Sequence, residues 1–275
     1  MTIKEALAKA TKQFAINHFI TPHLDAEILL SHVLNKPKEF LHTHPEKNLV
    51  KTQLKNFISL INKRLEKKPI AYLTKEKWFY GYKFYVNKDV LIPRPETEHL
   101  VEEALNITHK NNIQSILDLG TGSGNIVISL AKNLEKTKLV ATDKFASALK
   151  VAKKNAKKLD CLSKVSFKKS NLFDSLDERF DMIISNLPYV PEFIEVNTGE
   201  PRKAIYGGKI GTEIYEDFFK QINNYINNQG FIIIEIDAPA HDSMKKIIKK
   251  YLPNSKIFIK QDYSNKNRMM VIRLT

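Results

Sequence analysis

The sequence predicts an α/β protein whose doubly wound, Rossmann-like sheet follows a small all-α domain and a β-hairpin linker. Three observations support this prediction. From Ser115 onward, short apolar runs alternate with helical patterns, as in folds whose parallel strands are linked by helices. Before residue 75, apolar residues recur at helical spacing. Between the two parts, aromatic residues flank Gly81. The expected boundaries are 1–74 for the helical domain, 75–92 for the linker and 93–275 for the α/β domain.

The helical domain is expected to contain at least three helices. Thr2 and Glu5 have the spacing of a capping box at the start of the first helix. Thr21 is expected to cap the second helix, and Pro22 is expected in its first turn. Apolar residues mark the buried faces of the three helices: Ile3, Leu7, Ala10 and Phe14; Ala26, Leu29, Leu30 and Val33; Val50, Leu54, Phe57, Ile58, Ile61 and Leu65.

Residues 78–92 are expected to form a hairpin that joins the two domains. Aromatic residues around Gly81 are followed by the turn-like run 87–89 and by the apolar run 90–92. We expect Trp78 to pack in the core of this hairpin.

The α/β domain is expected to bind its ligands at the carboxyl ends of its strands, as open parallel sheets do. Its predicted strands lie at 115–119, 138–142, 165–168, 180–185, 231–236, 256–259 and 269–274, and helices fill gaps such as 125–134 and 146–159.

Composition narrows the class of protein. No apolar run approaches the length of a membrane span, and the lone Cys161 permits no internal disulfide, which fits a cytoplasmic protein. The net charge of +14 comes mostly from lysines, many of them on helix faces, so it favours solubility over direct nucleic-acid binding. His42, His44 and Glu46 have no second ligand cluster nearby in the sequence, and no metal site is expected.

A glycine-rich turn follows the first predicted strand of the α/β domain, and glycines there let a ligand approach the backbone closely. Asn125 stands where a dinucleotide fingerprint has Gly or Ala. Asp143, after the next strand, is placed to accept hydrogen bonds from ribose hydroxyls. S-adenosylmethionine is the expected cofactor, and a nicotinamide or flavin dinucleotide is the alternative. The residues expected at the cofactor are Gly120, Thr121, Gly122, Ser123, Gly124, Asp143, Asn171, Leu172 and Asn186.

The segment Asn186-Leu187-Pro188-Tyr189 follows the buried strand predicted at 180–185. Asn186 Oδ1 and the Leu187 carbonyl are two acceptors, which suit a planar NH2 group with two donor hydrogens. Accepting both hydrogens would return electron density to an amide nitrogen and orient its lone pair. Pro188 stiffens the turn and Tyr189 can pack on the planar group. Methyl transfer to an amide or amino nitrogen is the expected chemistry, and a plain Asn-x-Pro turn is the alternative.

Segments across most of the chain carry a family resemblance. They are Leu24-Asp25-Ala26-Glu27, Pro69-Ile70-Ala71-Tyr72-Leu73-Thr74, Leu91-Ile92-Pro93-Arg94-Pro95-Glu96-Thr97-Glu98, Glu200-Pro201-Arg202 and Gly207-Gly208. With the glycine loop and Asn186–Tyr189, they resemble the HemK/PrmC family, the protein-(glutamine-N5) methyltransferases of peptide chain release factors. The sequence departs from the family pattern at Lys75, Asn171, Leu187 and Asp237.

This resemblance implies a class I S-adenosylmethionine-dependent methyltransferase that methylates the side-chain amide nitrogen of a glutamine in release factors. Asn186, Leu187, Pro188 and Tyr189 would be the catalytic and glutamine-binding residues, and Arg94 and Glu96 would help to close the interdomain site. The helical domain would recognise the substrate, and a monomer is expected.

Two other substrates stay open. Asn-Leu-Pro-Tyr is also the version found in rRNA adenine dimethyltransferases, although their additional domain follows the catalytic fold and here the extra module precedes it. N6-adenine methylation of RNA or DNA is therefore one alternative, and glutamine methylation of a ribosomal protein is another. A non-catalytic binding module is the third class.

Overall fold

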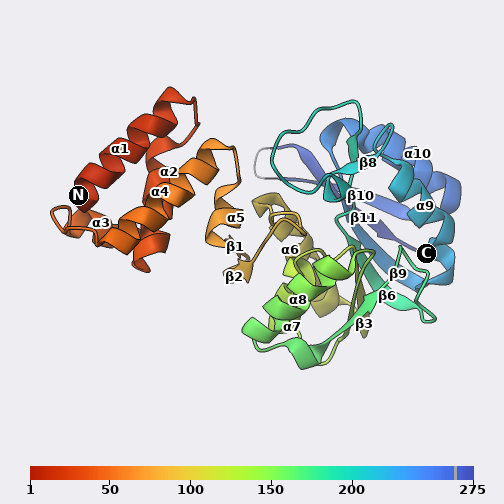
Figure 1. The fold of residues 1–275 in the computed structure, drawn as a ribbon. Coiled ribbons are helices and arrows are strands. Elements are labelled where there is room, and N and C mark those ends of the chain that lie inside the picture. Colours follow the sequence, from red (N-terminus) through yellow and green to blue (C-terminus); the bar gives the residue numbers. More distant parts are fainter. Residues whose placement is uncertain (263–264) are drawn as a thin grey trace. The chain divides into compact units, whose positions relative to one another are not determined.

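The structure is a computed structural model that describes residues 1–262 and 265–275. These residues divide into two compact units. The helical unit comprises Met1–Glu76 with Asn197–Gly199, and the α/β unit comprises Lys77–Val196 with Glu200–Thr275 (Figure 1). The boundaries expected from the sequence, at residues 74 and 92, stay a prediction. Among the described residues, no helix is long and apolar enough to cross a membrane.

The helical unit begins with the predicted capping box. Thr2 Oγ1 accepts a hydrogen bond from Glu5 N at 3.2 Å, and Glu5 Oε2 accepts one from Thr2 N at 2.8 Å. Thr21 and Pro22 occupy the predicted cap and first-turn positions of the second helix, but the Thr21 hydroxyl donates to Asp25 Oδ1 at 2.9 Å and accepts no hydrogen bond from the backbone. The helices of this unit are α1 (Ile3–Ile16), α2 (Pro22–Leu34), α3 (Lys38–Thr43), α4 (Lys51–Leu65) and α5 (Ile70–Thr74).

One apolar core holds α1, α2 and α4 together, and most of the predicted face residues belong to it. Val50 and Ile58 do not, with 57% and 45% of their surfaces exposed. Val50 only precedes the first turn of α4, and Ile58 lies beside the buried face that Phe57 and Ile61 occupy. His42 Nε2 lies 2.6 Å from Glu27 Oε1.

The predicted hairpin is present but shorter than expected. Strands β1 (Glu76–Phe79) and β2 (Tyr82–Tyr85) pair around Tyr80 and Gly81, which both have positive φ, of 49° and 75°. Two such residues in a two-residue loop match a type I′ hairpin turn. Residues 90–92 do not form a strand. Packing of Trp78 in the hairpin core was also wrongly predicted, since its side chain is 63% exposed while Phe79 and Phe84 are buried.

The α/β unit is built on a seven-stranded sheet in the order β10-β11-β9-β6-β3-β4-β5. Strands β5, β4, β3, β6 and β9 are parallel, and β11 runs antiparallel to both β9 and β10. This topology confirms the predicted doubly wound sheet. The strands are β3 (Ser115–Leu119), β4 (Lys138–Asp143), β5 (Val165–Lys169), β6 (Phe180–Ser185), β9 (Ile226–Glu235), β10 (Lys256–Gln261) and β11 (Asn267–Arg273).

Strand β9 begins at Ile226, five residues before its predicted start at 231. The start of β9 could not be recognised because residues 227–230 are polar or glycine. In the structure, Gln229 has a φ of 61°, and the pairing of β9 with β6 shifts register between Phe180 and Met182. A bulge of this kind breaks the alternation that identifies a strand. A separate pair of short parallel strands, β7 (Val190–Pro191) and β8 (Tyr206–Gly208), lies beyond the sheet.

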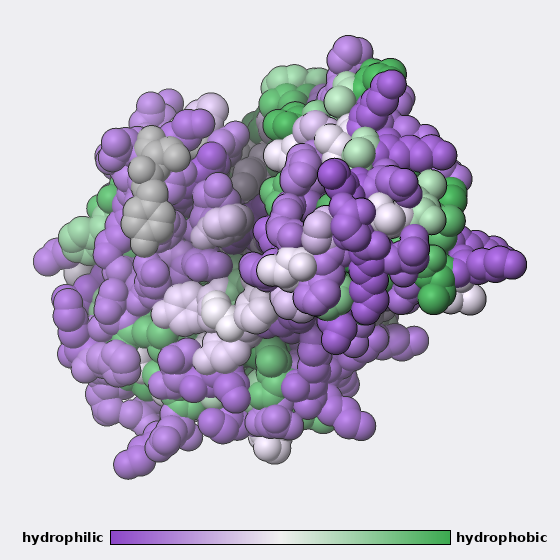
Figure 2. All heavy atoms as spheres, turned by 90° about the vertical axis from the view of Figure 1, so that its left-hand side faces the viewer, coloured by the Kyte–Doolittle hydropathy of each residue, from purple (hydrophilic) through white to green (hydrophobic). Residues whose placement is uncertain are grey.

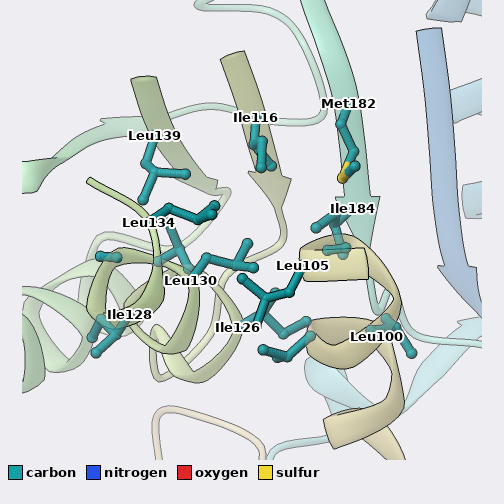
Figure 3. Packing of buried hydrophobic residues seen from close by; sticks show 14 of the residues in the cluster. Leu100, Leu105, Ile116, Ile126, Ile128, Leu130, Leu134, Leu139, Met182 and Ile184 are labelled. Atoms are coloured by element: carbon teal, nitrogen blue, oxygen red, sulfur yellow. The ribbon is translucent and has the colours of Figure 1, made fainter. Parts of the chain in front are cut away.

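Helices cover both faces of the sheet, and alternate residues of each strand serve the two cores. Ile116 and Ile184 pack with α6, α7 and α8 in one core, whereas Leu117 and Ile183 pack with α9 and α10 in the other. Figure 3 shows the first core, with Leu130 of α7 facing the strands. The helices are α6 (Glu98–Lys110), α7 (Asn125–Asn133), α8 (Ala146–Lys158), α9 (Glu213–Gln221) and α10 (His241–Tyr251).

Buried hydrophobic residues form the cores of both units. The face drawn in Figure 2 is mostly hydrophilic, with smaller, scattered hydrophobic areas. Charged residues make up 27% of the chain, and such residues lie mostly at protein surfaces.

Candidate active site

The glycine loop connects β3 to α7 at the carboxyl edge of the sheet. Gly120, Gly122 and Gly124 all have positive φ, of 80°, 56° and 81°. A Cβ on Gly124 would lie 2.8 Å from Ile128 and 3.1 Å from Ala152, so this glycine lets the loop pack on its neighbouring helices. A Cβ on Gly122 would meet no atom closer than 4.0 Å, which leaves open space above the loop.

Asp143 anchors this loop from the end of β4. Its Oδ2 accepts a hydrogen bond from Gly122 N at 3.0 Å, and its Oδ1 accepts one from Phe145 N at 2.8 Å. Burial raises the pKa of Asp143, and these two hydrogen bonds oppose that rise. The residue predicted to bind ribose therefore also fixes the shape of the loop.

Asp118 is a buried acid that the sequence analysis missed. Its Oδ2 accepts hydrogen bonds from Thr121 Oγ1 at 2.6 Å and from Val127 N at 3.2 Å, which join β3, the loop and α7. Its Oδ1 is buried without a hydrogen-bond partner among the described residues. Burial raises the pKa of Asp118 to about 7, although both hydrogen bonds oppose the rise. An acid near the end of a buried strand, two residues before a glycine loop, was the signal available in the sequence.

We expect Asp118→Asn to remove a pH dependence of stability. The pKa of Asp118 is about 7 in the folded protein, whereas its ordinary value is 3.8. As pH rises, the unfolded chain therefore loses this proton first, and the free energy of unfolding falls between pH 3.8 and about 7. From pH 5.5 to pH 8.5 the loss amounts to about 2 kcal/mol, at about 1.36 kcal/mol per pH unit. Urea unfolding at these two pH values would measure it in the wild type. The loss should be absent in Asp118→Asn, whose neutral amide can still accept from Thr121 and Val127. An equal loss in both proteins would contradict the role of Asp118.

A cavity of ≈ 330 Å³ lies over the glycine loop, within the α/β unit. Its volume is in the range of small-molecule sites. Eleven of the residues predicted at the site line it: Arg94, Gly120, Thr121, Gly122, Ser123, Asp143, Asn171, Leu172, Asn186, Leu187 and Pro188. Gly124, Tyr189 and Glu96 do not line this cavity. Lys203, Phe145 and Ile214 line it and were not predicted.

The acceptor motif, residues 186–189, follows β6 directly. Asn186 Nδ2 donates hydrogen bonds to Thr97 Oγ1 at 3.1 Å and to Glu235 Oε2 at 3.0 Å. Asn186 Oδ1 and the Leu187 carbonyl accept no hydrogen bond from the residues that the structure describes. Both acceptors that the sequence analysis assigned to an incoming NH2 group are thus available.

Other parts of the α/β unit hold the backbone of this motif. Leu187 N donates to Tyr215 Oη at 3.2 Å, and Tyr215 Oη donates to the Glu235 carbonyl at 2.8 Å. Gly207 of β8 packs so closely that a Cβ there would lie 2.4 Å from Pro188 O and 2.9 Å from Tyr189 Cα. Gly207 was expected only through the family resemblance, and Tyr215 was not predicted.

Arg94 lines the cavity and is held in place by Glu200 and by the backbone of its own segment. Its guanidinium pairs with the buried carboxylate of Glu200 and donates to the Ile92 carbonyl at 3.2 Å. Glu200 also accepts from Ile92 N at 2.9 Å. Glu96 is exposed, and its charge acts on the pKa of Glu235. The roles assigned to Arg94 and Glu96 in closing an interdomain site stay predictions.

The mostly parallel seven-stranded sheet and the glycine loop at its carboxyl edge define a class I methyltransferase. Solved structures agree: a methyltransferase from Pyrococcus furiosus matches with a TM-score of 0.54 at 19% identity, over 77% of this chain and 95% of that one. Residues 5–74 match the family model of the PrmC N-terminal domain, and residues 110–270 match a methyltransferase domain.

Curated relatives narrow the class to one family. The release factor glutamine methyltransferase of Koribacter versatilis is 35% identical to this chain, over 91% of this chain and 92% of the relative. The bifunctional methyltransferase of Rickettsia prowazekii is also 35% identical over 98% of this chain, which spans 57% of that protein's length. The chain belongs to the release factor glutamine methyltransferase family, which confirms the resemblance seen in its motifs.

Proposed function

We propose that this protein transfers a methyl group from S-adenosylmethionine to the side-chain amide nitrogen, N5, of a glutamine in peptide chain release factors. The orientation of Asn186 is the observation that carries the proposal. Because Nδ2 is engaged by Thr97 and Glu235, the amide oxygen is the atom left to accept a hydrogen bond from a guest. An NH2 group, with its two hydrogens, is the complement of this oxygen and the Leu187 carbonyl.

The cavity over the glycine loop fits the proposed cofactor. The open space above Gly122 permits close approach of a ligand to the backbone, and the Asp143 carboxylate stands beside it. Asn171 and Leu172, which line the same cavity, would contact the adenine. When bound, S-adenosylmethionine supplies an electrophilic methyl group.

The residues of this chain would contribute orientation and electron density. A primary amide nitrogen is a weak nucleophile because its lone pair is delocalised into the carbonyl group. Hydrogen bonds from its two N–H groups to Asn186 Oδ1 and to the Leu187 carbonyl would return density to the nitrogen and aim its lone pair into the cavity. Pro188 has no N–H and a restricted φ, which keeps the Leu187 carbonyl in place.

Incubation of the purified protein with methyl-labelled S-adenosylmethionine and one candidate substrate at a time tests this proposal. We expect label in a release factor, located by peptide mass spectrometry on a single glutamine. Ribosomal proteins and rRNA, offered separately at the same concentration, should stay unlabelled. Label only in RNA would refute the protein substrate, and label only on a ribosomal-protein glutamine would refute the release factor while keeping the chemistry.

A further inference from the structure

Glu235 is a buried carboxylate, 3% exposed, at the end of β9, the strand next to β6 in the sheet. Its Oε2 accepts hydrogen bonds from Thr97 Oγ1 at 2.6 Å and from Asn186 Nδ2 at 3.0 Å. Its Oε1 accepts one from Tyr189 Oη at 3.1 Å. One side chain therefore holds both polar ends of the acceptor motif, and none of its oxygens lines the cavity.

The direction of these hydrogen bonds determines which end of the Asn186 amide can face Glu235. The Thr97 hydroxyl has one hydrogen, and it donates this to Glu235. Towards Asn186, Thr97 can then only accept, and an ionised Glu235 can also only accept. A flipped Asn186 would place its oxygen 3.0 Å from a carboxylate oxygen, with no hydrogen between them. The amide nitrogen must point to Glu235, and the amide oxygen must point away from it.

Burial and hydrogen bonding act in opposite directions on the protonation of Glu235, and its hydrogen-bond donors favour the ionised, accepting state. Burial raises the pKa of Glu235, and the charge of Glu96 adds to the rise. The hydrogen bonds from Thr97 and Tyr189 and the positive charge of Arg268 oppose it. Three donors aimed at one carboxylate are consistent with an anion that serves only as an acceptor.

We propose that Glu235 is a positioning residue that fixes the Asn186 amide and thereby selects a guest side chain bearing NH2 over one bearing a carboxylate. The proposal deepens the proposed function and rests on it for the identity of the guest. Glutamine supplies the two hydrogens that the site accepts. Glutamate supplies only acceptors, which would face Asn186 Oδ1 and the Leu187 carbonyl without a hydrogen. A site with fixed polar groups discriminates strongly against a guest that leaves them unpaired.

Glu235→Gln tests the proposal, because glutamine has the same shape but brings a donor NH2 group to the carboxylate position. That group can repel Asn186 Nδ2 and permit the amide to flip. We expect kcat for the release factor to fall about 100-fold, comparable to the loss of one oriented hydrogen-bonding group in other active sites. The dissociation constant for S-adenosylmethionine, measured by calorimetry, should change less than about twofold, since Glu235 does not line the cavity.

The choice of guest gives a readout that a purely structural role would not move. A release factor with its acceptor glutamine replaced by glutamate is offered as a competitor of the normal one. This competitor should inhibit the wild type weakly. For Glu235→Gln, its inhibition constant, divided by the KM of the normal factor, should be at least about 10-fold lower than for the wild type, since a flipped Asn186 presents NH2 to the guest. An unchanged preference, despite a lower kcat, would overturn the proposal.

A direct measurement makes the result independent of the substrate. In the free protein, NMR would follow hydrogen exchange of the Asn186 side-chain amide, which is assigned by its absence in Asn186→Ala. We expect both protons to be protected in the wild type and exposed in Glu235→Gln; equal protection in both would refute the positioning role. If the wild type fails to label a release factor, the proposed function fails while this measurement still decides the role of Glu235.

Two further variants serve as controls for folding and for charge. Thr97→Val removes one of the two acceptors for Asn186 Nδ2 and leaves the Glu235 carboxyl group in place as the other, so we expect a smaller loss of kcat, about 10-fold, and a preserved preference for glutamine. If Glu235→Gln did not fold, Thr97→Val would be used for the test in its place. Loss of the preference of Thr97→Val for glutamine over glutamate would then contradict the proposal. Glu178→Gln, at a partly exposed ion pair with Lys138 outside the cavity, should leave all these quantities unchanged.

Discussion

Asn186→Ala is expected to lose methyl transfer by about 10³-fold, because much of the catalytic advantage in a two-substrate displacement comes from orientation of the reacting groups. The variant removes the amide oxygen that would accept from the guest and leaves the Leu187 carbonyl as the remaining acceptor. It also leaves Glu235 with two of its three donors, Thr97 and Tyr189. Single-turnover transfer to the release factor would measure the loss, and calorimetry with S-adenosylmethionine should show a dissociation constant within about threefold of the wild type.

A matched control is Asn223→Ala, which removes an amide that donates to the Tyr251 carbonyl at 3.3 Å and does not line the cavity. Its transfer rate should stay at the wild-type value. If Asn186→Ala lost cofactor affinity to the same extent as transfer, Asn186 would be a cofactor residue first, and its assignment to the guest amide would be wrong.

Gly207→Ala should be the second most damaging change, and its effect should be local. The added Cβ would meet Pro188 O at 2.4 Å, Gly211 O at 2.6 Å and Tyr189 Cα at 2.9 Å. All three are backbone atoms, so no flexible side chain can move aside, and the acceptor motif must shift. We expect transfer to fall more than about 100-fold, since small misplacements of reacting groups cost this much. The sheet should keep its fold, as followed by circular dichroism.

Gly81→Ala provides the comparison for Gly207→Ala. A Cβ on Gly81 would meet no atom within 4 Å, but its φ is 75°. We therefore expect a stability cost of about 1 kcal/mol from the backbone alone, with transfer unchanged. If Gly207→Ala transferred the methyl group at a rate within about threefold of the wild type, β8 would not hold the acceptor motif. Such a change in rate is a small change in the barrier, because a tenfold change corresponds to about 1.4 kcal/mol.

The sheet was predictable because its strands are buried on both faces and read as apolar runs. Strands β3 and β6 begin and end at the predicted residues. Where polar residues and a bulge interrupt the run, as at 227–230 in β9, the start of the strand was lost. Exposure of individual residues was less predictable. Trp78 has strong core propensity, yet it lies at the surface, with Lys83 Nζ 5.5 Å from the centre of its ring.

The candidate site divides in the same way. Gly122, Asp143 and Asn186 could be predicted, since each lies at or just after the end of a predicted strand and is a residue type that commonly binds ligands. Thr97, Tyr215 and Glu235 lie far from the acceptor motif in the sequence, and their hydrogen bonds to it exist only after the chain folds. For Glu235, the strand order offered a partial signal, because an acid at the end of the strand beside β6 must lie near Asn186.

Helix α9 contacts both the cavity and the acceptor motif. Ile214 and Asp217 line the cavity, while Tyr215, between them in sequence, holds the Leu187 amide through its hydroxyl. Any ligand in the cavity that displaces this turn of α9 must also displace the Leu187 carbonyl, which is attached to the same residue. Thermodynamic linkage then requires reciprocity: a cofactor that tightens binding of the acceptor is itself bound more tightly when the acceptor is present, by the same factor. If the proposed function holds, this turn of helix would couple the binding of the cofactor to the binding of the acceptor.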